Sequence, residues 1–186
     1  MSGTHNLPQK HSQKSELVVQ KYGSAVEFAK TFNPDLQKAC AGNLERTFTG
    51  DAPTIGLLKA TYTEKQVQAW IMAQLVNLNS FSGSKNKMEP QQMLMLSDII
   101  LTDYHYLKAS ELLLFFYQFK AGKFGELYGS VDPLRVSNAL IEFAAYRRAE
   151  LFKIESKLAE VKAAEDEEKR LKNAVTYEEY LSRRDK

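Results

Sequence analysis

Glu111-Leu112-Leu113-Leu114-Phe115-Phe116-Tyr117-Gln118-Phe119 is the stretch that decides the fold. Apolar residues cover nearly the whole circumference of a helix built from it, and a helix of that character is buried on most sides. A buried helix needs other helices around it. We therefore expect this segment to lie in the middle of an all-α bundle.

Helix start and stop signals recur on both sides of this segment. Asn33-Pro34 and Asp132-Pro133 each combine an N-cap residue with a proline at the first helical position. Thr63-Glu64-Lys65-Gln66 has the form of a capping box. We predict helices over about 15–32, 34–42 and 55–60, further helices that begin near 64, 90 and 111, and a last one from 132 to beyond 172. Residues 47–53 are predicted to form a loop.

This pattern predicts a single helical bundle with a long, partly protruding C-terminal helix. The bundle domain is expected to span 15–161. A polar, disordered tail over 1–14 precedes it, and a charged helical extension with a short C-terminal helix over 162–186 follows it.

Composition narrows the classes of function. The chain has 186 residues, of which 44% are hydrophobic and 26% charged, as in globular proteins. Its net charge is only +2, so it lacks the strong electrostatic footprint of a non-specific nucleic-acid binder. The longest apolar run is shorter than the roughly 20 residues that a membrane span requires. The single cysteine, Cys40, fits a reducing compartment, so we expect a cytoplasmic protein that does not enter a membrane.

The connector that follows the apolar helix is the first candidate for a binding site. Glycines at 122, 125 and 129 alternate with lysine and aromatic residues, which is typical in outline of a loop that contacts nucleic acid or a phosphopeptide. The spacing matches neither a P-loop nor a dinucleotide fingerprint. In the alternative interpretation, Phe124 and Leu127 pack the connector against the core while Lys123 is solvated. The candidate binding residues are Lys120, Lys123, Phe124, Tyr128, Arg135, Arg147 and Arg148.

The second candidate is a heptad seam over 140–161, whose spacing alternates by four and three residues. Arg147 interrupts it, and beyond Val161 the seam positions become Glu165 and Glu168. The seam predicts pairing with another protein or with a second copy of the chain. Its members are Leu140, Ala144, Arg147, Leu151, Ile154, Leu158 and Val161.

No catalytic or metal-binding constellation is evident. His105 is the only histidine outside the N-terminal tail, and its neighbours at helical spacing include no nucleophile with a supporting base. An enzyme would require His105 to meet a distant carboxylate such as Glu64 or Glu111. We expect no metal, no cofactor and no enzymatic activity.

Three stretches carry a resemblance to a known family: 48–54 (Phe-Thr-Gly-Asp-Ala-Pro-Thr), 69–75 (Ala-Trp-Ile-Met-Ala-Gln-Leu), and 119–134 with its Phe-Lys-Ala-Gly and Tyr-Gly-Ser-Val-Asp-Pro-Leu words. From Phe48 to Arg148 the chain resembles an uncharacterised family of small helical proteins from Bacteroides-group bacteria and their mobile elements. The resemblance implies a bacterial cytoplasmic origin and assigns no activity. The leading hypothesis is a non-enzymatic adaptor that binds another protein, or a second copy of itself, through the 140–161 seam and the C-terminal arm. The alternative is a nucleic-acid-associated accessory factor of a mobile genetic element.

Overall fold

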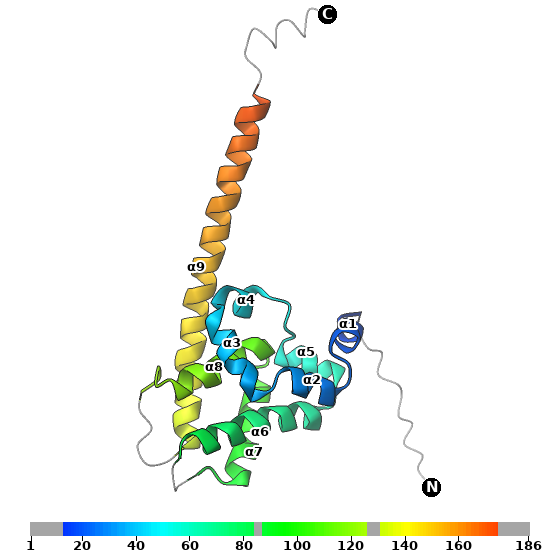
Figure 1. The fold of residues 1–186 in the computed structure, drawn as a ribbon, viewed down its shortest axis with the longest axis vertical. Coiled ribbons are helices and arrows are strands. Elements are labelled where there is room, and N and C mark those ends of the chain that lie inside the picture. The colour runs from blue at the N-terminus through cyan, green and yellow to red at the C-terminus, as the bar shows by residue number, and fades with distance from the viewer. Residues whose placement is uncertain (1–12, 84–86, 126–130, 175–186) are drawn as a thin grey trace, which may run out of the picture. The chain divides into compact units, whose positions relative to one another are not determined.

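The computed structural model describes residues 13–83, 87–125 and 131–174, and these are helical with short connections (Figure 1). The predicted all-α fold with a long C-terminal helix is confirmed. The chain divides into two compact units, 1–145 and 146–186, called here the first and second unit. The elements are α1 (Gln13–Tyr22), α2 (Ala25–Thr31), the 3-10 turn η1 (Pro34–Leu36), α3 (Gln37–Gly42), α4 (Leu44–Thr49), α5 (Ile55–Thr61), α6 (Glu64–Phe81), α7 (Pro90–Asp103), α8 (Ala109–Lys120) and α9 (Pro133–Asn173).

Helix α8 is the centre of the first unit, as its sequence predicts. Every residue from 109 to 116 is buried, and α3, α4 and α6 all pack against it. The ring of Phe115 contacts Phe116 and Phe119 on the same helix and Phe143 on α9, with centroids 5.2 to 5.8 Å apart. Edge and tilted contacts of this kind add to the stabilisation that comes from burying apolar area.

The start of α8 is fixed by Lys108 and Glu111. The buried Glu111 carboxylate accepts a hydrogen bond from the backbone N–H of Lys108 at 2.8 Å, which closes a capping box. The Lys108 ammonium donates to the carbonyls of Phe48 and Gly50, each at 2.6 Å. These carbonyls lie at the C-terminal end of α4, where a cation is favoured by the helix dipole. One lysine therefore joins two helices that are 60 residues apart in the chain.

The first predicted helix, 15–32, is wrong as a single element. Gly23 has a φ of +73°, a left-handed conformation that ends α1 and separates it from α2. Ser24 then opens α2, because its hydroxyl and the Glu27 carboxylate form a capping box. Gln13, which the sequence assigned to the tail, lies in α1 together with Lys14.

Two other parts of the prediction have different outcomes. Residues 47–49 belong to α4 and not to a loop, because Asn43 caps that short helix through the backbone N–H of Arg46 at 2.9 Å. The short helix predicted after 173 lies outside the described residues. None of the described helices is long and apolar enough to cross a membrane.

Helix α9 contributes to both units. Val136, Ala139, Leu140 and Phe143 are buried in the first unit. In the second unit every side chain from Lys157 to Lys172 is exposed. The division between the units falls at 145 and 146, whereas the sequence places the end of the bundle domain at 161.

Candidate functional site

The connector residues predicted from the sequence lie in different environments. Lys120 is half-buried at the end of α8, and its ammonium donates to the Asn77 side chain at 2.8 Å and lies 5.5 Å from the centre of the Phe81 ring. Desolvation lowers the pKa of Lys120. It lines a hollow of about 310 Å³ together with Asp35 and Tyr117. Lys120 therefore already has contacts within the first unit.

Phe124 packs into the core. Its ring lies 5.8 Å from that of Phe115 and 6.4 Å from that of Phe143, measured between centroids. The Arg135 guanidinium donates to the backbone carbonyl of Phe124, which fastens the connector to the start of α9. Gly125 has a φ of +91°, and a Cβ at that position would collide with the Arg135 side chain. This arrangement agrees with the part of the interpretation that packs Phe124 against the core, while Leu127, the other residue of that interpretation, lies outside the described residues.

The remaining candidate binding residues do not all belong to the same unit of the described structure. Lys123 is exposed on the connector. Tyr128 lies outside the described residues. Arg147 and Arg148 belong to the second unit, where Arg147 is half-buried and Arg148 exposed. Of the predicted set, the structure joins Phe124 and Arg135 by a direct contact.

The side chains considered for acid/base chemistry make structural contacts. His105 is exposed, and its Nδ1 lies 2.9 Å from the backbone carbonyl of Thr102. Glu64 forms an ion pair with Lys59 at 2.7 Å, and Glu111 caps α8. Within the described ranges, no group of three or more His, Cys, Asp or Glu side chains is placed to hold a metal ion.

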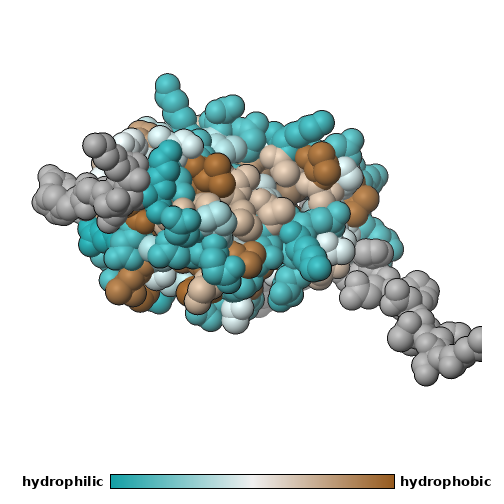
Figure 2. Space-filling view, turned by 90° about the horizontal axis from the view of Figure 1, so that it is seen from below, coloured by the Kyte–Doolittle hydropathy of each residue, from teal (hydrophilic) through white to brown (hydrophobic). Residues whose placement is uncertain are grey.

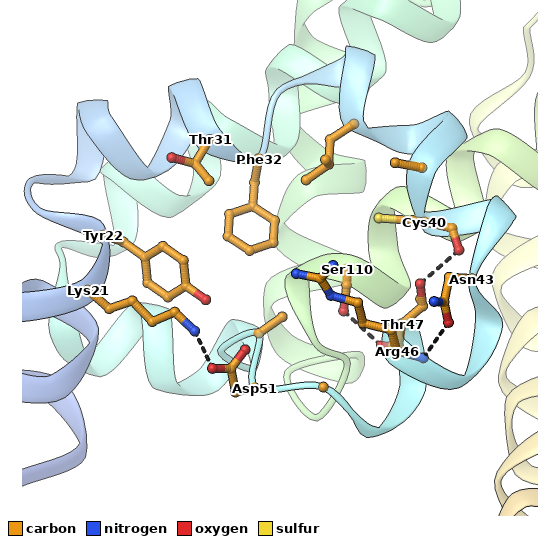
Figure 3. Close-up of a pocket in the computed structure, with 14 residues that line it drawn as sticks. Lys21, Tyr22, Thr31, Phe32, Cys40, Asn43, Arg46, Thr47, Asp51 and Ser110 are labelled. Carbon is orange, nitrogen blue, oxygen red and sulfur yellow. Dashed lines mark hydrogen bonds and ion pairs between the residues drawn. The ribbon is translucent and has the colours of Figure 1, made fainter.

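A pocket of about 350 Å³ opens in the first unit between α1, α3, α4 and the start of α8 (Figure 3). Phe32, Leu36 and Ala39 form an apolar wall. Lys21 and Asp51 form an exposed ion pair at another side of the pocket, and Arg46 extends from α4 toward its middle (Figure 3). The combination of an apolar wall with a few polar groups is typical of small-molecule sites.

The charged groups of this pocket sum to one positive charge. Lys21 and Asp51 neutralise each other, and their hydrogen bond lowers the pKa of Asp51 and raises that of Lys21. Arg46 is exposed, and no carboxylate of the described residues lies within ion-pair distance of its guanidinium, although its charge contributes from farther away to lowering the pKa of Asp51. Arg46 therefore supplies the unbalanced charge.

The hydroxyl and thiol groups at the back of the pocket are not set up as nucleophiles. The Thr47 hydroxyl donates to the carbonyl of Cys40 at 2.7 Å, and the Ser110 hydroxyl donates to the carbonyl of Thr47 at 2.8 Å. Cys40 is buried, and desolvation raises the pKa of its thiol. A thiol in that environment stays protonated at neutral pH, whereas reactive cysteines have a lowered pKa.

The seam is partly buried and partly exposed. Leu140 lies fully inside the core of the first unit. Leu151 and Ile154 are half-buried, while Leu158 is 54% and Val161 49% exposed. Side chains of the last two turns pair along the helix, as in the contact of Lys172 with Glu168. The part of the seam that retains exposed apolar area is therefore 151–161.

Elsewhere the exposed apolar residues carry less information. On the face seen in Figure 2, hydrophobic residues lie in small groups framed by hydrophilic side chains. Small groups of this kind occur on ordinary protein surfaces and do not by themselves mark a site.

A protein family described as of unknown function, DUF6633, matches residues 87–186, which is more than half of the chain. The chain belongs to this family. The DUF6633 match includes α7, α8 and α9, and therefore the whole seam and all connector candidates, while most residues of the pocket precede it. The match overlaps the resemblance seen in the sequence over 87–148, which includes the stretch 119–134, whereas the stretches 48–54 and 69–75 lie outside it. Comparisons with curated proteins and with solved structures found no match.

Proposed function

We propose that this protein is a non-enzymatic adaptor of the bacterial cytoplasm that binds another protein through seam residues 151–161 of α9. The observation that carries the proposal is the exposure of Leu158 and Val161 on the same helical stripe as Leu151 and Ile154. Covering the exposed half of either side chain contributes about 1 kcal/mol. A partner helix that also covered the two half-buried residues would gain more.

The charges beside the seam favour a different protein over a second copy in parallel orientation. A parallel pair of α9 helices would place Arg147 opposite Arg147 of the second copy, at a core position. At the flanking positions it would also place Glu150 against Glu155, and Lys157 against Lys162. Each of these contacts joins like charges, so a parallel homodimer is disfavoured.

An antiparallel pair is only partly better. If its two-fold axis passed beside Ser156, Arg147 would meet Glu165 of the second copy, which is a favourable contact. However, Glu155 would then meet Glu155, and Lys157 would meet Lys157. A heterologous helix with complementary flanking charges avoids both conflicts, and we therefore assign the seam to such a partner.

The test uses the full chain with an affinity tag and compares the wild type with two double variants, each in lysate with and without nuclease treatment. Leu158→Glu with Val161→Glu places two charges on the seam. Ala159→Glu with Ala163→Glu places the same two charges on exposed positions outside it. Both variants should keep the circular dichroism and melting behaviour of the wild type, because all four positions are exposed.

We expect a discrete protein to be captured by the wild type and the control variant and lost with the seam variant. Equal capture by both variants would contradict the role of the seam. Capture that disappears on nuclease treatment would instead identify nucleic acid as the ligand. A dimer detected by light scattering and lost only in the seam variant would show that the partner is a second copy.

A further inference from the structure

The pocket of Figure 3 is built from residues that the proposed function does not use. Its volume of about 350 Å³ lies at the lower end of the range for small-molecule sites, which is roughly 300 to 1,000 Å³. Its residues come from α1, the α2–α3 region, α4, the connection between α4 and α5, and α8, so the packed first unit defines its walls. A hollow of this size accommodates a small ligand with little rearrangement of the surrounding helices.

The chemistry of the walls specifies two parts of that ligand. Phe32, Leu36 and Ala39 offer an apolar surface. Arg46 points into the same space in Figure 3 and supplies the one positive charge that the pocket does not neutralise itself. A guanidinium presents its N–H groups as a planar fork that matches a carboxylate in a bidentate contact.

We propose that this pocket binds a small organic carboxylate with an aromatic or branched aliphatic group, in which Arg46 holds the carboxylate and Phe32 and Leu36 contact the apolar part. The single unbalanced positive charge matches a monoanion better than a phosphate monoester, which carries close to two negative charges at neutral pH. The Lys21–Asp51 ion pair lies at the boundary with a second hollow of about 500 Å³, because both hollows share these two residues. A longer ligand could extend past that exposed pair, since surface ion pairs contribute little.

The experiment is a titration followed by NMR of the ¹⁵N-labelled full chain. The probes are 3-phenylpropanoate, its neutral analogue 3-phenylpropanamide, and inorganic phosphate. For a ligand of this size, a dissociation constant on the order of 1 mM is expected. The carboxylate should shift the amide signals of residues 36–52, and the amide should bind about tenfold more weakly, since it lacks the charge.

Arg46→Gln should reduce the affinity for the carboxylate to that for the amide. Arg170→Gln removes the same charge from an exposed site outside the pocket, where Arg170 pairs with Glu167, and should leave binding unchanged. The proposal is overturned if the carboxylate and amide bind equally, if Arg46→Gln binds like the wild type, or if no pocket signal shifts. Tighter binding of phosphate than of the carboxylate would overturn the assigned ligand class.

Discussion

Replacing Phe124 by alanine tests whether the glycine connector is held in the core or offers its aromatic ring to a ligand. Phe124 is 6% exposed, so the substitution removes a ring that is almost fully buried against Phe115 and Phe143. A buried phenylalanine hides about 150 Å² of surface, which corresponds to about 4 kcal/mol at about 25 cal/mol per Å². Since the unfolded chain already covers part of that surface, we expect the free energy of unfolding to fall by about 3 kcal/mol.

Urea denaturation followed by circular dichroism and by Trp70 fluorescence measures this change. Trp70 lies in the core and donates to the carbonyl of Phe32 at 2.7 Å, so its emission reports on tertiary structure. For a chain of this length the melting temperature should fall by about 6 to 12 °C. Phe152→Ala is the matched control, because Phe152 is 71% exposed and the same substitution should cost about 0.5 kcal/mol or less there. A loss for Phe124→Ala no larger than that of the control would refute the core placement of the connector.

Three further predictions concern Lys108, Glu27 and Cys40. Lys108→Met keeps the aliphatic stem but removes two hydrogen bonds to carbonyls at the end of α4. The free energy of unfolding, measured by urea denaturation, should therefore fall by about 2 kcal/mol. An unchanged urea midpoint would contradict the stabilising role of these hydrogen bonds. Glu27 accepts two hydrogen bonds from Ser24, which lower the pKa of its carboxyl below the usual 4.5. The ionised Glu27 carboxylate therefore stabilises the folded state above pH 4.5, and this stabilisation is lost as the pH falls through the lowered pKa. The melting temperature of Glu27→Gln should fall less steeply below pH 4.5 than that of the wild type. Parallel curves of melting temperature against pH would contradict this contribution of Glu27. Cys40 should react with a disulfide reagent at about pH 8 only after unfolding, because the thiol is buried and its pKa raised; rapid reaction of the folded protein would show that the pocket wall opens.

The helical fold could be predicted because its main elements carry strong local signals. Apolar residues cover nearly the whole circumference of α8, which predicts a buried helix. Helix α6 begins at a capping box formed by Thr63 and Gln66. These signals depend on residues close together in the sequence. The break at Gly23 also has a local signal, since Ser24 and Glu27 are spaced as a capping box, but the apolar spacing across 17–29 obscured it.

The candidate sites were less predictable because they depend on contacts between distant residues. The glycines marked the connector, yet whether Phe124 faces solvent or the core is decided by Phe115 and Phe143. The pocket brings Lys21, Arg46 and Ser110 together from three helices. Part of the pocket wall is α4, a helix of six residues. The threonine and glycine residues around it favour turns, so the sequence predicted a loop there.

The most direct test of the adaptor hypothesis is photo-crosslinking in cells of the source organism. A photoreactive phenylalanine analogue would replace Leu158 in one strain and Ala163 in another, since both positions are exposed on α9 but only 158 belongs to the seam. We predict a light-dependent adduct with one discrete protein from position 158 and none from position 163. Equal adducts from both positions, or no protein adduct from position 158, would contradict binding through the seam.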